Sequence, residues 1–141
     1  GVGIFTDFFQ KNEFKNYKGI DLNKDVIINL KRKYPNYNFE QSDICKNTIT
    51  GKFDLILMIS VTQHIIRDRY LKFILDNIQN SLNDDGLFLV TDMNVKRRDS
   101  IYTTRRTLEF YEKNMPKMKF IEMRDFEGLK LFIFRKAEGK Q

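Results

Sequence analysis

Two aspartates, each placed where a strand-like stretch ends, have the chemistry to bind a ligand. Asp21 closes the stretch from Tyr17 to Leu22, and Asp43 closes a second stretch after Gln41. In nucleotide-binding α/β sheets, ligands bind at the carboxyl ends of the strands. One carboxylate can accept hydrogen bonds from both hydroxyls of a ribose. Asp21 is therefore predicted to bind such a diol, with a helix-capping acid as the alternative role.

A glycine turn precedes both acids. Gly1 and Gly3 are followed by phenylalanines at helical spacing, beginning with Phe5. Glycine permits positive φ and a close approach of the backbone to a ligand, and the free N–H groups of a first helical turn bind anions. The turn and the two acids stand in the order and at the intervals that a bound adenosyl group requires. Taken alone, the two glycines would be read as an ordinary turn.

Polar residues also follow the most apolar stretch of the chain, Phe53–Ile59. Ser60 comes directly after it, and His64, the single histidine, stands a few residues further on. An imidazole could remove a proton from an acceptor amine or alcohol. The alternative is a polar residue near the start of a helix.

The elements that must position these residues alternate between strands and helices. Strands are expected around Ile20 and over 37–41, 53–59, 87–92, 119–126 and 129–135, and helices over 5–16, 26–34, 68–82 and 107–115. This alternation predicts an α/β fold, doubly wound, with a mostly parallel sheet and helices on both faces. The nearly continuous apolar stretch 53–59 is typical of a strand covered on both faces.

Several local signals mark where these elements end. Asn23 and Asp68 are predicted to cap the helices that follow them. Gly86 is suited to a left-handed position at the end of the long helix. Glu127 and Gly128 separate the last two strands so closely that an antiparallel hairpin is expected. This hairpin would add one antiparallel strand at an edge of the sheet.

The segment 93–106 is expected to be irregular, and it is basic. A substrate lid or a contact to RNA is one reading, and a solvated loop is the favoured one. The basic residues are Lys96, Arg97, Arg98, Arg105 and Arg106.

Composition limits the class of protein. With 141 residues, 41% of them hydrophobic, the chain suits one globular domain. A net charge of +6 permits an acidic or nucleic-acid partner without requiring one. Cys45 and His64 are each the single residue of their type, so neither a disulfide framework nor a metal site is predicted. No apolar run approaches the roughly 20 residues that span a bilayer, and no signal peptide is seen, so a cytoplasmic location is expected.

Taken together, these motifs resemble the class I S-adenosylmethionine-dependent methyltransferases from Gly1 to about Lys136. Members of that family carry the glycine loop, an acid after each of the next two strands, an apolar strand that opens with Phe-Asp, and a final hairpin. Here the Phe-Asp pair is Phe53-Asp54, and the family's Leu-x-x-x-Gly turn is found at Leu82–Gly86.

The resemblance implies S-adenosylmethionine as the cofactor. Asp21 would bind the ribose hydroxyls, Leu22 would pack on the adenine, Asp43 would accept from its amino group, and the N–H of Ile44 would donate to a ring nitrogen. Gly1, Gly3 and Phe5 would lie near the methionine part of the cofactor, and Ile59 and Ser60 would lie beside its sulfonium. The full implied set is Gly1, Gly3, Phe5, Asp21, Leu22, Asp43, Ile44, Ile59 and Ser60, with His64 as the candidate catalytic base.

Two departures from the family pattern matter. Phe5 replaces the third glycine of the loop, where its ring could crowd the methionine part or pack beneath the loop. The strand that precedes the loop in the family is missing, so residues 1–141 are expected to be a single domain truncated at its N-terminus. Because that strand lies centrally in the family's sheet, the Ile20 strand and the 55–59 strand are not expected to pair directly.

The predicted function is methyl transfer by in-line displacement to a small-molecule or peptide acceptor. A nucleic-acid acceptor is less favoured, no membrane partner is expected, and the oligomeric state is left open. The alternative is a non-catalytic remnant of the fold that serves as an interaction module. A nicotinamide-binding domain fits poorly, because its third glycine would fall at Thr6.

Overall fold

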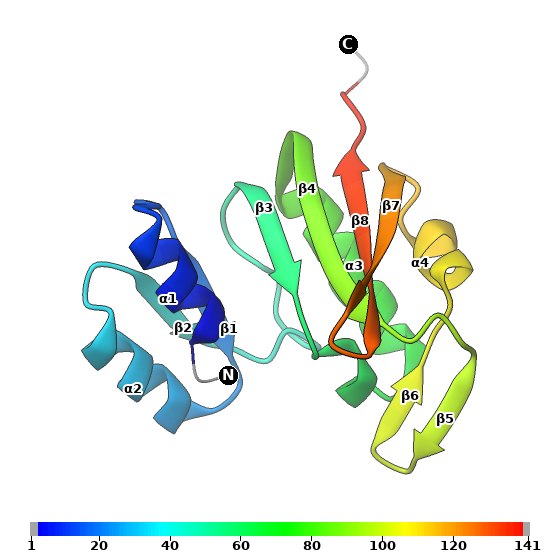
Figure 1. Cartoon of the computed structure of the whole chain (residues 1–141), viewed down its shortest axis with the longest axis horizontal. Helices are drawn as coiled ribbons and strands as arrows, with labels where there is room; N and C mark the ends of the chain where they lie inside the picture. Colours follow the sequence, from blue (N-terminus) through cyan, green and yellow to red (C-terminus); the bar gives the residue numbers. More distant parts are fainter. Residues whose placement is uncertain (1–2, 140–141) are drawn as a thin grey trace. The chain divides into compact units, whose positions relative to one another are not determined.

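The computed structural model describes residues 3–139, so Gly1, a predicted site residue, lies outside the described residues. The chain divides into an N-terminal unit that ends at Asn47 and a C-terminal unit that begins at Thr48. Each unit contains its own sheet or sheets, as the strand labels in Figure 1 show. Within the described residues, none of the helices is long and apolar enough to cross a bilayer.

The N-terminal unit contains two helices and a two-stranded parallel sheet. In chain order its elements are α1 (Ile4–Lys11), β1 (Lys18–Asp21), α2 (Lys24–Lys33) and β2 (Asn38–Gln41). The α1 helix ends at Lys11, earlier than the predicted 16, where Asn12 takes the C-cap position.

Aromatic rings form the core of this unit on one face of its sheet. The ring of Tyr17 lies 5.5 Å from that of Phe9 in α1 and 6.0 Å from that of Phe39 in β2. A Cβ at Gly19, opposite Phe39 in the ladder, would lie 2.8 Å from the Phe39 ring, so only glycine permits this close packing. The same ring belongs to a buried cluster with three residues of the α2 segment: Ile27, Leu30 and Tyr34.

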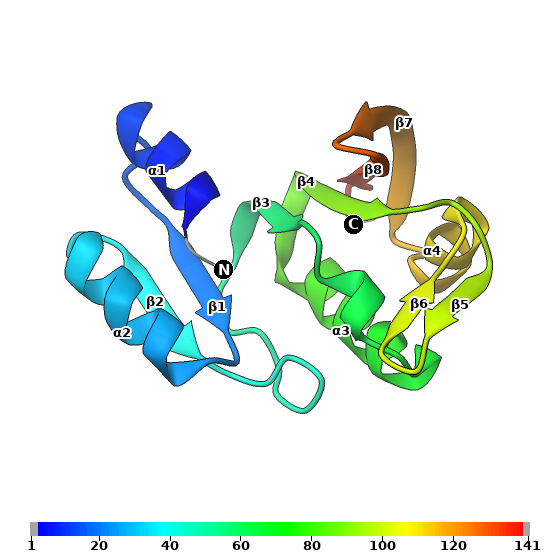
Figure 2. The ribbon, with the colours of Figure 1, turned by 60° about the horizontal axis from the view of Figure 1, so that its bottom comes forward.

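The C-terminal unit is built on a four-stranded sheet in the order β3-β4-β8-β7. A separate hairpin of β5 and β6 projects away from it (Figures 1 and 2). The elements are β3 (Phe53–Met58), the 3₁₀ helix η1 (Thr62–His64), α3 (Asp68–Ser81), β4 (Leu82–Asp92), β5 (Arg97–Ser100), β6 (Thr103–Arg105), α4 (Leu108–Asn114), β7 (Met118–Phe126) and β8 (Leu129–Lys136).

The α3 helix lies behind this sheet in Figure 1 and supplies the apolar stripe that the sequence pattern predicts. Its buried residues include Leu71, Ile74, Leu75 and Ile78.

Along β4, the buried side chains of Phe88 and Val90 alternate with the half-buried ones of Leu87 and Leu89. The strand therefore has one fully covered face, the usual consequence of side chains pointing alternately to opposite faces of a sheet.

The sheet of this unit is mixed, so the prediction of a mostly parallel sheet with one antiparallel hairpin strand is confirmed in part. Strands β3 and β4 are parallel, but β8 runs antiparallel to both of its neighbours. The antiparallel strand also lies inside the sheet, not at the edge, which is formed by β7. Burial explains the order, because Phe132 and Phe134 of β8 are 0% and 1% exposed, whereas Ile121 and Met123 of β7 are each 43% exposed.

The predicted turn at Glu127 and Gly128 is confirmed. Both residues have positive φ, 49° and 79°, as a two-residue type I′ hairpin turn requires. The Asn23 cap is confirmed as well, since its Oδ1 accepts from the N–H groups of Asp25 at 2.9 Å and Val26 at 3.2 Å.

Two other predicted ends are wrong. Asp68 is the first residue inside α3, which follows Arg67 without a side-chain cap. The left-handed residue near the end of this helix is Asp85, with φ 62°, and not Gly86. Gly86 is needed for a different reason: a Cβ there would lie 2.8 Å from the carbonyl oxygen of Asn83.

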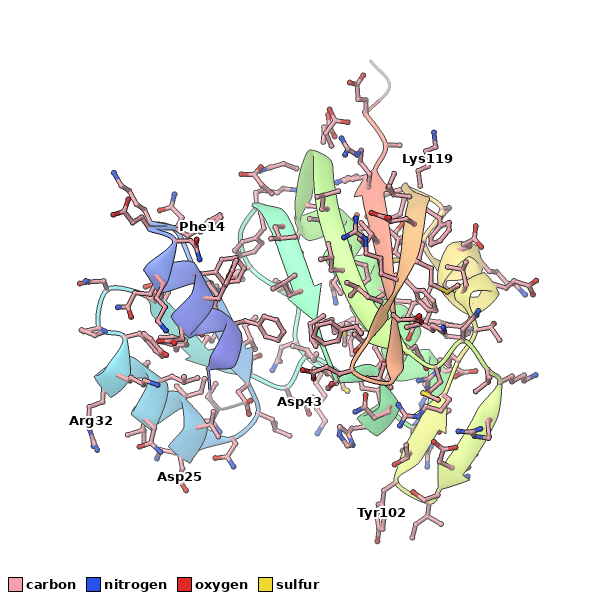
Figure 3. The ribbon with its side chains drawn as sticks, viewed as in Figure 1. Phe14, Asp25, Arg32, Asp43, Tyr102 and Lys119 are labelled. Atoms are coloured by element: carbon pink, nitrogen blue, oxygen red, sulfur yellow. The ribbon has the colours of Figure 1, made fainter. Side chains whose placement is uncertain are left out.

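The segment 93–106 is also more regular than predicted, because β5 and β6 pair as an antiparallel hairpin within it. Tyr102, at the tip of this hairpin, is 73% exposed (Figure 3). Among the described residues, β1 pairs with β2 within the N-terminal unit, and β3 pairs with β4 within the C-terminal unit.

Candidate functional site

In the N-terminal unit, Asp21 and Asp43 both lie at the carboxyl ends of the strands of the β1–β2 sheet. Asp21 is the last residue of β1 and stands opposite Gln41, the last residue of β2. The N–H of Ser42 donates to the carbonyl of Asp21 at 3.1 Å, so Asp43 follows directly after this rung (Figure 3 labels it). The parallel register thus brings together two acids that are 22 positions apart in the sequence.

The carboxylate of Asp21 is oriented by the start of the next helix. Its Oδ1 accepts from the N–H of Asn23 at 2.8 Å, and Asn23 in turn caps α2. Burial alone would raise the pKa of Asp21, but hydrogen bonds to its carboxylate, including that from the Asn23 N–H, hold the pKa below its ordinary value. Leu22, next to this ionised group, is 65% exposed. An apolar surface and a carboxylate therefore stand side by side at the strand end.

Asp43 opens a tight turn. Its Oδ1 accepts from the N–H of Cys45 at 3.0 Å, and its carbonyl accepts from the N–H groups of Lys46 and Asn47. Asp43 and Ile44 are both half-buried. Burial and then the nearby Asp43 carboxylate raise the pKa of the Cys45 thiol, a shift that disfavours the nucleophilic thiolate.

Glycine is required at position 3 for structural reasons, in addition to the predicted contact with a ligand. Gly3 has φ 88°, and a Cβ there would lie 2.7 Å from Cδ2 of Leu30. It is the N-cap of α1, and no side chain caps this helix end. Phe5, in the first turn of this helix, is 37% exposed.

In the C-terminal unit, Ile59 and Ser60 follow the end of β3. Ser60 is exposed and has φ 57°, a left-handed conformation that costs a non-glycine residue about 1–3 kcal/mol. A hydrogen bond from its N–H to Oγ1 of Thr91, 2.8 Å long, holds it there. His64 is the last residue of η1, and its side chain is exposed. Ser60 and His64 therefore both face solvent just beyond this strand.

Beneath these residues lies a buried polar cluster that sequence reasoning did not identify. Asp92, at the end of β4, is 1% exposed. It accepts from the hydroxyl of Tyr111 at 2.5 Å, from the N–H of Arg106 at 3.0 Å and from the N–H of Met93 at 2.7 Å. Burial first, and then the charge of Asp92, raise the pKa of Tyr111 well above its ordinary value. The signal that could have found Asp92 is the one used for Asp21, an acid at the end of an apolar strand.

The five basic residues of the segment 93–106 differ in their exposure to solvent. Arg106 is only 3% exposed, so its assignment to a solvated basic loop is wrong. Arg105 is half-buried and pairs with Asp99 at 2.9 Å. Only Lys96, Arg97 and Arg98 remain as exposed basic residues of the group.

Comparison with known proteins identifies the family. A family model described as a methyltransferase domain matches residues 1–88. No match is found among curated proteins.

Solved structures share the fold at low sequence identity. The N-methyltransferase NodS from Bradyrhizobium japonicum WM9, in complex with S-adenosyl-L-homocysteine, is 16% identical with a TM-score of 0.79, over 97% of this chain and 74% of that chain. An S-adenosylmethionine-dependent methyltransferase from Mesorhizobium loti is 12% identical with a TM-score of 0.80, over 96% and 87% of the two chains. One from Clostridium acetobutylicum ATCC 824 is 17% identical with a TM-score of 0.77, over 98% and 81%.

These neighbours agree with the cofactor that the sequence predicts, since S-adenosylmethionine is the donor named for two of them and its product is bound to the third. The resemblance inferred from the glycine loop and the strand-end acids is thereby confirmed. This chain belongs to the methyltransferase domain family, with the fold of the class I S-adenosylmethionine-dependent methyltransferases.

Proposed function

We propose that this chain transfers a methyl group from S-adenosylmethionine to a small-molecule or peptide acceptor, with residues 1–141 acting as a single domain. The observation that carries the proposal is the edge of the β1–β2 sheet. There Asp21, exposed Leu22 and Asp43 stand together at the carboxyl ends of two parallel strands.

The chemistry of this edge fits an adenosine. The nucleoside offers two ribose hydroxyls and one amino group as donors, and an apolar ring. The edge offers the carboxylates of Asp21 and Asp43 as acceptors, the exposed side chain of Leu22 as an apolar surface, and the N–H of Ile44 as a donor. Hydrogen bonds to charged groups contribute about 1.5–3 kcal/mol each, so the two acids would account for most of the affinity for the nucleoside.

The remaining cofactor residues would serve the methionine part and the sulfonium. Gly1 and Gly3 would place the uncapped start of α1 near the methionine carboxylate, since backbone N–H groups there favour anions. Phe5 would border the same part of the cofactor with its exposed ring. Ile59 and Ser60 would lie beside the sulfonium, after the fourth strand of the family pattern.

The cofactor, when bound, supplies a methyl group already activated by the sulfonium. The protein then has to hold donor and acceptor in line, and alignment of this kind can supply much of the rate. His64 would take up the proton released by an amine or alcohol acceptor, for which its exposed imidazole is accessible.

Calorimetric titration with S-adenosylhomocysteine tests the cofactor site. The wild-type chain is expected to bind, and Asp21→Asn to bind at least about tenfold more weakly, because the amide keeps one acceptor and loses the charge. The control is Asp25→Asn, an exposed acid in the first turn of α2, which should bind like the wild type (Figure 3 labels Asp25). Equal loss in both variants would refute a specific role for Asp21.

A second candidate function follows from Phe5. Its ring stands where the family has a glycine, and a blocked cofactor site would leave a non-catalytic interaction module. In that case the wild-type chain would show neither heat nor a thermal shift with S-adenosylhomocysteine. Phe5→Gly then discriminates: binding by this variant alone would show that the ring occludes the site.

A further inference from the structure

The side chain of Arg106 is buried and makes four hydrogen bonds from its guanidinium. It donates to Oδ1 of Asp68 at 2.8 Å and to the carbonyl oxygens of Thr62 at 3.2 Å, Ile65 at 2.6 Å and Ile66 at 3.3 Å. Only 3% of the residue is exposed. A charge so deeply buried is tolerated because each of the three guanidinium nitrogens donates to at least one acceptor.

Three of these acceptors belong to the short segment that carries His64. The η1 helix within it has a single turn, closed by hydrogen bonds from the N–H of His64 to Val61 and from the N–H of Ile65 to Thr62. One 3₁₀ turn has poor hydrogen-bond geometry and little stability of its own. The last carbonyls of a helix also lack donors within it. Arg106 supplies donors to the carbonyls of Ile65 and Ile66 from outside the segment and adds a second donor to that of Thr62.

Arg106 is itself attached to the sheet. Its backbone N–H donates to Oδ1 of Asp92 at 3.0 Å, at the end of β4, and its guanidinium carbon lies 5.4 Å from the centre of the Phe110 ring. Thr62 is tied to the same strand end, because its hydroxyl donates to the carbonyl of Thr91 at 2.9 Å. Arg106 therefore links this short segment, through its guanidinium, to the end of β4, through its backbone N–H.

We propose that Arg106 is a positioning residue that fixes residues 62–66 and thereby sets the orientation of His64. The inference rests on the proposed role of His64 in methyl transfer, although the conformation itself can be measured without activity. We expect that lysine cannot replace arginine at this position, because its ammonium group is a point charge that cannot reach four acceptors spread around a plane.

The single histidine of the chain makes the test direct. In the wild-type protein, the carbon-bound imidazole protons of His64 should give one sharp set of NMR signals. In Arg106→Lys we expect these signals to shift and to broaden or double, because residues 62–66 exchange between conformations. Signals in Arg106→Lys that match the wild type in position and width, in a folded protein, would overturn the proposal.

Two control variants separate positioning from stability. Arg98→Lys alters an exposed arginine of the same basic segment, so the His64 signals should not change. Ile78→Val removes one methyl group from the α3 core, where Ile78 is 2% exposed. It should lower the melting temperature without moving the His64 signals. If Ile78→Val moved them as far as Arg106→Lys does, the effect would be general loosening and the proposal would fail.

A milder variant covers the case in which Arg106→Lys does not fold. Asp68→Asn weakens one partner of the guanidinium on its exposed side, where the Asp68 side chain is 57% accessible. The His64 signals should move in the same direction but by less, and an unchanged spectrum would count against the proposal. Titration of the same samples with S-adenosylhomocysteine tests the proposed function independently. A wild type that fails to bind would refute that function while leaving the result on Arg106 intact.

Discussion

Acids stand at strand ends in both units, yet their surroundings differ. Asp21 and Asp43 are half-buried, and each accepts from the N–H of a residue two positions ahead in its own turn. Asp92 is almost fully buried and accepts from Arg106 and Tyr111, which are 14 and 19 positions away.

This difference indicates two uses of the same local motif. A carboxylate held by its own turn is oriented without tying distant parts of the chain together, so it can serve a ligand. A buried carboxylate must have its hydrogen bonds satisfied by the protein, because an unpaired charge in the interior is very costly. Asp92 is therefore expected to support stability, and Asp21 and Asp43 to support binding.

The largest predicted effect is on stability, in Asp92→Ala. Three donors, the hydroxyl of Tyr111 and the N–H groups of Met93 and Arg106, would lose their acceptor. At about 1–3 kcal/mol for each unsatisfied buried group, the free energy of unfolding should fall by about 4 kcal/mol. Urea denaturation measures it, with Asp21→Ala as the control, for which we expect a loss within about 1 kcal/mol. Equal losses in the two variants would mean that Asp92 and Asp21 do not differ in their contribution to stability.

A second prediction concerns alkaline pH and Tyr111. Its pKa in the folded protein is raised well above the ordinary value, chiefly by burial, so the folded state keeps a proton that the unfolded chain releases above about pH 10. The stabilising effect of the protonated hydroxyl is fully present below that pH and is lost as the pH rises through the higher folded value.

Tyr111→Phe provides the comparison. At neutral pH it should lower the free energy of unfolding by about 1–2 kcal/mol, the net value of the hydrogen bond to Asp92. The difference between wild type and variant should then shrink above about pH 10, as followed by urea denaturation at a series of pH values. A difference that stays constant across this range would mean that Tyr111 titrates in the folded protein as it does in the unfolded chain.

A smaller effect, on binding alone, is expected for Asp43→Ala. Loss of the acceptor for the adenine amino group should weaken binding of S-adenosylhomocysteine about tenfold, or about 1.4 kcal/mol. Stability should change little. Glu40→Ala is the matched control, because Glu40 is an exposed acid in β2 whose ion pair with Lys18 is of the surface type that contributes little. If both variants bind alike, the nucleoside does not use Asp43.

The smallest effect is predicted for Leu22→Ala. Since Leu22 is 65% exposed, its truncation should leave the free energy of unfolding within about 0.5 kcal/mol of the wild type. Affinity for S-adenosylhomocysteine should fall about fivefold, because about 1 kcal/mol of apolar contact with the adenine is lost. Calorimetry and urea denaturation on the same sample check both numbers. A stability loss without any loss of affinity would place Leu22 in the core and not in the cofactor site.

Sequence signals proved reliable wherever one residue and its near neighbours decide the outcome. The side chain of Asn23 caps α2 because the N–H groups from which it accepts are only two and three positions further along the chain. Glu127 and Gly128 turn the final hairpin because two residues are all that separate the paired strands, and both adopt positive φ. The strands expected around Ile20 and over 37–41 likewise match β1 and β2, which end at or just before Asp21 and Asp43.

Other features were decided only by the tertiary structure. The hydrogen bonds of Arg106 reach 44 positions back to Thr62, and the pairing of β8 between β4 and β7 depends on which strand can bury its phenylalanines. In the sequence, Arg106 is simply one of several basic residues, and Asp92 has the same local context as Asp21. What separates them is burial, and burial is set by the packing of the whole unit, because desolvation depends on every neighbour in space and not on the neighbours in the chain.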